Sequence, residues 1–220
     1  MNNKKRIINS TLRYVRKKLA HDSSGHDWWH VYRVWKIAKK IANKEGDKLN
    51  VFVIELASLL HDIADYKLHS GNEDIGPTKA RKWLEKMNVS VDEINHVCKI
   101  IKDISFRGAK VKSKAKTKEG MIVQDADRID ALGALGIARA FAYGGRMGKL
   151  IYDPSIKPVM HGSFEEYKNN KSSTINHFYE KLLLLEKLMN TEYAKRIARE
   201  RTMFMKKFLE EFYSESDGSR

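Results

Sequence analysis

His61 and Asp62 are adjacent at the end of an apolar run, and this imidazole–carboxylate pair is the strongest chemical signal in the chain. Such a pair usually serves metal coordination or acid–base catalysis. His30 lies upstream and Asp127 downstream, so two imidazoles and two carboxylates are available to one divalent metal ion. A metal ion held by nitrogen and oxygen donors activates water for attack on phosphate esters and anhydrides.

Asp65 follows His61 by four residues, and this spacing puts both side chains on one face of a helix. We therefore expect Asp65 to act as a general base or acid on water, beside Asp62, which also takes part in catalysis. Other readings of single residues stay open. His30 alone is typical of a capping or core histidine, and Asp127 with its acidic neighbours could serve only a helix start.

Helical periodicity runs through most of the chain, and no segment alternates cleanly between polar and apolar residues. The pattern predicts an all-α bundle of roughly eight to ten helices. Gly76-Pro77 opens one of them, and Ser90 to Glu93 reads as the capping box of another. The predicted helices cover residues 7–19, 28–43, 49–64, from 76, 90–104, 121–143, from 163, 174–189 and 191–213.

A short turn at residues 46–48 joins the helices predicted at 28–43 and 49–64, which should therefore pack antiparallel. At the α-helical rise, His30 lies roughly 26 Å and His61 roughly 18 Å from this turn. His30 on one helix and His61 with Asp62 on the other are therefore expected at the same end of the hairpin. A later helix must deliver Asp127 to that end, and a carboxylate in such an apolar segment needs a cation or hydrogen-bond partners.

The 220 residues, 42% of them hydrophobic, suffice for a core, and with only 3 prolines and no linker-like stretch they indicate one domain. We expect that domain to span residues 1–220, with residues 163–213 packing on its core as C-terminal helices. The single cysteine is consistent with a reducing compartment. The sequence shows no leader-like apolar segment and no run of the ~18 apolar residues that a membrane span needs, so we expect a cytoplasmic protein without membrane contact. The net charge of +14 raises the question of nucleic acid, but the cations are spread along the chain, so we do not favour that partner.

The ordered set of His30, His61-Asp62 and Asp127 resembles the HD-domain superfamily of metal-dependent phosphohydrolases. The flanking stretches are similar to its YpgQ/YedJ-like branch, from about residue 21 to 212. These stretches are residues 26–34 (HDWWHVYRV), 60–65 (LHDIAD), 124–133 (QDADRIDALG), 136–145 (GIARAFAYGG) and 177–183 (HFYEKLL).

The resemblance implies the HD fold and one divalent ion held by His30, His61, Asp62 and Asp127. Mn²⁺ is the favoured ion, with Mg²⁺, Ni²⁺, Co²⁺ and Fe²⁺ as alternatives. For this branch it also implies a nucleotide pyrophosphohydrolase, which converts nucleoside triphosphates, deoxy forms above all, to monophosphate and pyrophosphate. The expected partner is thus a small nucleotide or other phosphate ester, bound by a monomer or homodimer.

Charge on the leaving pyrophosphate calls for cations close to the metal. The candidate substrate-binding residues share a basic side chain near one of the quoted stretches, and they are Arg33, Lys67, Arg139 and Lys181. Lys110 is a further candidate, but it lies in a lysine-rich segment that is typical of a solvated surface.

Residues 102–106 (KDISF) depart from some members of the family, in which a histidine precedes the Ser-Phe pair and serves a second metal. Ile104 stands in that place here, and His96 is a poor substitute, so a two-metal phosphodiesterase is disfavoured. Two alternatives remain open beside the pyrophosphohydrolase: an HD-type phosphodiesterase or 5′-nucleotidase, and a basic nucleic-acid- or nucleotide-binding module without catalysis. A purely structural helical protein is the least favoured of all.

Overall fold

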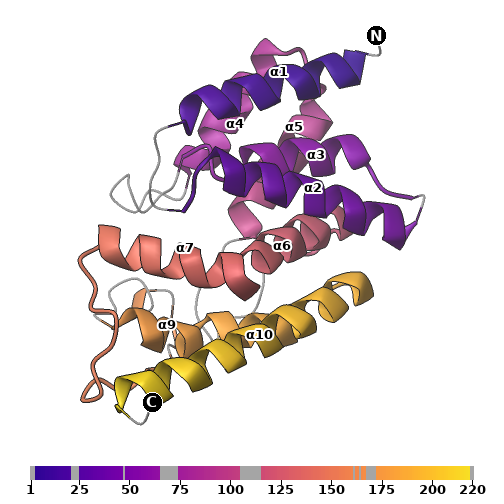
Figure 1. Cartoon of the computed structure of the whole chain (residues 1–220). Helices are drawn as coiled ribbons and strands as arrows, with labels where there is room; N and C mark the ends of the chain where they lie inside the picture. The colour runs from indigo at the N-terminus through magenta and orange to yellow at the C-terminus, as the bar shows by residue number, and fades with distance from the viewer. Residues whose placement is uncertain are drawn as a thin grey trace. The chain divides into compact units, whose positions relative to one another are not determined.

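Every regular element in the described part of the chain is a helix (Figure 1). The computed structural model describes residues 3–20, 25–46, 48–64, 74–104, 115–160, 162–163, 165–166 and 172–218. Over these residues the helices are α1 (Asn3–Lys18), α2 (Trp28–Glu45), α3 (Val51–Leu60), α4 (Ile75–Lys86), α5 (Val91–Asp103), α6 (Lys118–Asp130), α7 (Gly133–Arg146), α9 (Thr174–Glu180), the 3-10 helix η2 (Leu182–Leu188) and α10 (Glu192–Ser216). The predicted all-α class is confirmed.

Two compact units share the chain, and the boundary between them falls within α6. The described residues up to Asp127 belong to the N-terminal unit, and those from Arg128 onward belong to the C-terminal unit. The expectation of one domain with residues 163–213 packed on its core therefore stays a prediction.

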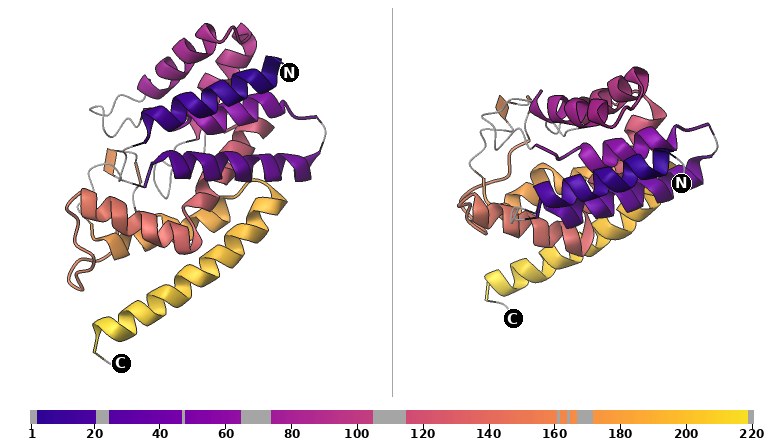
Figure 2. Two further views of the ribbon diagram at one scale, coloured as in Figure 1. Left: turned by 45° about the horizontal axis from the view of Figure 1, so that its top comes forward. Right: turned by 90° about the horizontal axis from the view of Figure 1, so that it is seen from above.

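In the N-terminal unit, α2 and α3 form the predicted hairpin and lie side by side (Figure 2). Between Phe52 and Leu60, Glu55 is the one residue of α3 that is not buried. A helix that is apolar on all sides must lie inside the protein, and α3 is in contact with α1, α2 and α5. It thus forms the centre of this unit and holds the segment that carries His61.

Side-chain caps set the starts of several helices in this unit. Asp27 accepts a hydrogen bond from the backbone N–H of His30 at 2.9 Å, and Asn50 accepts one from Val53 at 3.2 Å. The Ser90 hydroxyl accepts from the N–H of Glu93 at 3.4 Å and donates to Glu93 Oε2 at 2.8 Å. Because each cap satisfies a backbone donor that the helix leaves unpaired, it fixes where the helix begins.

The prediction of one continuous helix over residues 121–143 is wrong. The chain leaves the helix after Asp130, Leu132 is extended with φ −116° and ψ 158°, and Gly133 has φ +74°. A positive φ is readily adopted only by glycine. A Cβ on Gly136 would overlap the carbonyl of Ala131, so this second glycine allows a tight corner between α6 and α7.

The C-terminal unit contains α7, α9, η2 and α10. The helix predicted over 174–189 is divided at Lys181, whose φ of −142° and ψ of −59° end α9 before the 3-10 turn of η2. Phe141, Phe178 and Phe208 pack their rings together with centroids 5.9–6.1 Å apart.

Among the described residues, no helix is both long and apolar enough to span a bilayer.

Candidate metal centre

The imidazoles of His30 and His61 meet at the open end of the α2–α3 hairpin. The buried His30 ring projects from the first turn of α2, and His61 follows the last residue of α3. Their Nε2 atoms are 3.2 Å apart. The antiparallel packing predicted from the short turn therefore brings these two side chains together.

The ring of His61 is oriented by the protein main chain. Its Nδ1 lies 2.8 Å from the carbonyl oxygen of Ser58. Because a carbonyl oxygen only accepts hydrogen bonds, Nδ1 carries a proton, and Nε2 is the nitrogen that faces His30 and can serve as a metal ligand. A backbone bond on the far nitrogen is the usual way in which proteins aim an imidazole at a metal.

Two carboxylates complete the cluster. Asp62 Oδ2 lies 3.2 Å from His30 Nε2 and 3.5 Å from His61 Nε2, and Asp127 Oδ1 lies 3.5 Å and 3.8 Å from the same atoms. The four residues predicted as metal ligands are thus brought together from three distant stretches. Two groups of side chains in this cluster could hold a metal ion, and they share His30: one adds His61 and Asp127, and the other adds His26 and Asp62. Within each group the donor atoms lie within 4.8 Å of one another.

The part of helix α6 up to Asp127 belongs to the N-terminal unit and is bonded to it at two positions. Glu119 in its first turn accepts from the backbone N–H of Asn50 at 3.0 Å, and Gln124 donates to the carbonyl of Ile104 at 3.2 Å. These bonds place Asp127, the next turn of the helix, beside the two histidines. The Asp127 side chain is 34% exposed, so this carboxylate is less buried than its apolar flanks predicted.

Burial alone would raise the pKa of Asp62, but the nearby imidazoles of His61 and His26, with hydrogen bonds from His26 and His30, lower that pKa well below its usual value. Asp62 is therefore an ionised acceptor. Two imidazole nitrogens and two carboxylate oxygens suit a divalent ion such as Mn²⁺, Fe²⁺, Co²⁺ or Ni²⁺. With the His61 ring already oriented by the Ser58 carbonyl, this donor set fits a divalent cation.

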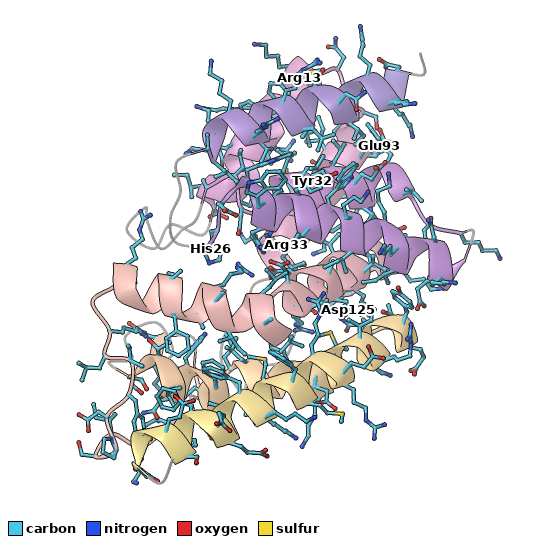
Figure 3. All side chains as sticks on the ribbon, viewed as in Figure 1. Arg13, His26, Tyr32, Arg33, Glu93 and Asp125 are labelled. Atoms are coloured by element: carbon cyan, nitrogen blue, oxygen red, sulfur yellow. The ribbon has the colours of Figure 1, made fainter. Side chains whose placement is uncertain are left out.

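The other predicted site residues do not all belong to the cluster or to the same unit. Arg33 is half-buried on α2, one turn beyond His30 (Figure 3). Arg139 belongs to the C-terminal unit, where its Nη1 donates to the buried Asp130 at 3.1 Å. Lys181 also belongs to that unit, between α9 and η2. Asp65, Lys67 and Lys110 lie outside the described residues, so their roles stay predictions.

His26 is a member of the cluster that the sequence analysis did not assign to the site. Its Nδ1 lies 2.7 Å from Asp62 Oδ2, and its ring meets the edge of the His30 ring with centroids 5.5 Å apart. The available signal was a second histidine four residues before His30, which by itself does not distinguish a helix cap from a functional group.

Residues 28–132 match the HD domain family. The chain is 36% identical over 206 residues to the protein YpgQ of Bacillus subtilis, covering 93% of this chain and 91% of YpgQ. A solved structure of YpgQ in complex with ADP superposes with a TM-score of 0.75 and 30% identity in the superposition, covering 97% of this chain and 96% of that one.

Two further crystal structures agree with this relationship. A protein from Lactobacillus plantarum has a TM-score of 0.85 and 39% identity, with 96% and 97% of the two chains covered. An HD-superfamily hydrolase from Bacillus thuringiensis has a TM-score of 0.72 and 43% identity, with 97% and 98% covered. The chain belongs to the HD-domain family, and within it to the YpgQ-like branch. With its His/Asp cluster, it is a metal-dependent phosphohydrolase.

Proposed function

We propose that this phosphohydrolase is a nucleotide pyrophosphohydrolase, which cleaves a nucleoside or deoxynucleoside triphosphate to the monophosphate and pyrophosphate. The observation that supports the proposal is the approach of Asp62 and Asp127 to the paired imidazoles of His30 and His61, at 3.2–3.8 Å. The choice of a nucleotide is supported by the relationship to YpgQ, whose structure was solved with ADP.

His30, His61, Asp62 and Asp127 would hold one divalent ion, for which Mn²⁺ is our first choice. Such an ion supplies Lewis acidity, which lowers the pKa of water and offsets phosphate charge. The Ser58 carbonyl keeps the His61 ring in the orientation that this role requires.

The remaining chemistry falls to residues around the cluster. In the proposal, Asp65 takes the proton of the attacking water. Helix α3 ends at Leu60 and not at residue 64 as predicted. This role therefore rests on the closeness of Asp65 to His61 and Asp62 in the sequence. Arg33, one turn beyond His30, offers a guanidinium to the phosphates, and such a group binds phosphate oxygens in pairs. Lys67, Arg139 and Lys181 remain the other proposed phosphate-binding residues.

Ile104 weighs against a two-metal phosphodiesterase. It is buried, and its carbonyl accepts from Gln124, so a hydrophobic side chain stands where some HD hydrolases place an additional histidine. A 5′-nucleotidase differs in its product, because it releases inorganic phosphate rather than pyrophosphate. Product analysis therefore separates the candidates.

The test uses purified protein that has been stripped of metal with a chelator. We expect dATP to yield dAMP and pyrophosphate only after Mn²⁺ is added. Asp62→Ala should lower kcat/KM by more than the roughly 10–100-fold typical for loss of an outer-shell partner of a metal. Asp217→Ala, which removes an exposed carboxylate beyond α10, serves as the matched control and should behave as wild type.

Inorganic phosphate as the only phosphate product would refute the pyrophosphohydrolase and favour the 5′-nucleotidase. Full activity of Asp62→Ala would refute a reaction centred on this cluster. Binding of nucleotide or nucleic acid that needs no metal and weakens steeply with salt, without any product, would instead favour the basic binding module.

A further inference from the structure

His26 contacts the metal centre and is one of three residues, with His30 and Asp62, whose donor atoms lie within 4.8 Å of one another. It immediately precedes Asp27, the N-cap of α2, whose backbone is extended with ψ 178°. The His26 ring meets the ring of His30, in the first turn of the helix, at an interplanar angle of 81°. The same position puts His26 Nδ1 at 2.7 Å from Asp62 Oδ2.

The chemistry of this contact decides which atom donates. A carboxylate that holds a cation is ionised, and an ionised carboxylate only accepts hydrogen bonds. The proton between the two residues therefore belongs to His26 Nδ1. A protonated ring nitrogen has no lone pair, so Nδ1 of His26 does not ligate a metal while this bond exists.

Asp62 Oδ2 is the oxygen that also faces the metal-binding imidazoles, at 3.2 Å from His30 Nε2 and 3.5 Å from His61 Nε2. The carboxylate of an aspartate can rotate about the Cβ–Cγ bond, which exchanges the positions of its two oxygens. A short charge-assisted bond from a ring that is only 26% exposed opposes that rotation. The Asp62 carboxylate is thus held with Oδ2 toward the two imidazoles.

We propose that His26 is a positioning residue of the metal centre, which raises the affinity for a divalent ion by donating its Nδ1 hydrogen to Asp62 Oδ2. This inference rests on the metal-ligand role given to Asp62 in the proposed function. It does not depend on which phosphate compound is cleaved.

The experiment is calorimetric titration of metal-free protein with Mn²⁺ alone. His26→Ala should weaken Mn²⁺ binding about 10–100-fold, the range typical for outer-shell partners of metal ligands. His26→Asn should restore most of the affinity, because the amide nitrogen of asparagine occupies the place of Nδ1. His26→Gln carries the same amide one methylene further out, so it should not restore the affinity.

His96→Ala is the control, since His96 bonds to Thr117 on the α6 side of the unit, and it should bind Mn²⁺ as wild type does. Wild-type affinity in His26→Ala would overturn the proposal. Equal weakening in the Asn and Gln variants would overturn the role of the Nδ1 donor. If His26→Ala melts far below wild type without metal, the comparison of Asn with Gln decides alone, because both keep a polar side chain at the position.

These titrations contain no nucleotide, which separates the two proposals. Wild-type protein that binds Mn²⁺ with the predicted ranking of variants, yet releases no pyrophosphate, would refute the proposed reaction and support the role of His26. Wild-type protein that binds no Mn²⁺ would overturn both.

Discussion

The Nε2 atoms of His30 and His61 lie 3.2 Å apart although 31 positions separate the residues in the chain. Two ring nitrogens at this distance require a proton or a cation between them, because two facing lone pairs would repel each other. Because these side chains come together only in the folded chain, a metal ion that binds them should add to the stability of the fold.

Mn²⁺ should raise the melting temperature of the metal-free protein. Binding to the folded state alone contributes about 2.7 kcal/mol when the free ion is at 100 times its Kd. His61→Ala should abolish most of this upward shift, which differential scanning fluorimetry with and without Mn²⁺ would measure. An undiminished shift in His61→Ala would mean that the ion binds elsewhere.

Ser58→Ala should leave the protein as stable as wild type or more stable, by up to about 1 kcal/mol. The Ser58 hydroxyl is buried and has no hydrogen-bond partner among the described residues, so its removal takes away an unpaired polar group. Mn²⁺ affinity should not change, because His61 bonds to the main-chain carbonyl of residue 58. Urea unfolding and calorimetry are the measurements, and a loss above 1 kcal/mol would contradict the assignment.

Two glycines of α7 should respond in opposite directions to alanine. At Gly136 an added Cβ would overlap the Ala131 carbonyl, whereas at Gly145 it would meet open space. We expect Gly136→Ala to destabilise by about 1–3 kcal/mol, as overpacking does, and Gly145→Ala to be neutral or to stabilise by up to about 1 kcal/mol. Urea midpoints of the two variants provide the comparison, and a stable Gly136→Ala would argue against the tight corner.

Glu93 should make stability depend on acid pH. Burial raises the pKa of Glu93, but hydrogen bonds from Lys4 and Ser90 lower it below the ordinary value of 4.5. A lowered pKa contributes stability above 4.5 that is lost as the pH falls through the folded-state value.

The matching variant is Glu93→Gln, which should cost about 0.5–1.5 kcal/mol at neutral pH and should lose less stability than wild type on acidification. The free energy of unfolding, followed from pH 7 downward, is the measurement. Parallel pH profiles for the two proteins would show that Glu93 has the same pKa in the folded and unfolded states, and would contradict the prediction.

The sequence was sufficient to predict the helical class and the α2–α3 hairpin. The periodic apolar residues of α2 and the nearly continuous apolar run of α3 distinguish a half-buried helix from a central one. The short turn between them then determines which ends meet, and His30 and His61 lie together as predicted.

Breaks in helices were harder to predict. Residues 131–136 contain small side chains that suit both a helix and a corner, and only the backbone shows that Gly133 has a positive φ. Lys181 similarly ends α9 without a proline or glycine to signal it. Local composition does not determine these angles, because tertiary contacts decide between two acceptable conformations.

The site itself was predicted in part. The four residues with recognisable spacing converge, and His26 was not assigned because its role depends on Asp62, which is 36 positions away. Asp125 and Asp130 are fully buried while Asp127 is partly exposed, and three aspartates within six residues do not reveal this difference.

The support of His61 comes from a peptide carbonyl, and this has an evolutionary consequence. Any residue that fits at position 58 supplies the same carbonyl, so substitutions there leave the orientation of the His61 ring unchanged. The other side of the cluster relies on the side chain at position 26, where a single codon change alters the contact to Asp62. Substitutions that alter the affinity of this centre for a divalent ion should therefore occur at position 26 rather than at position 58.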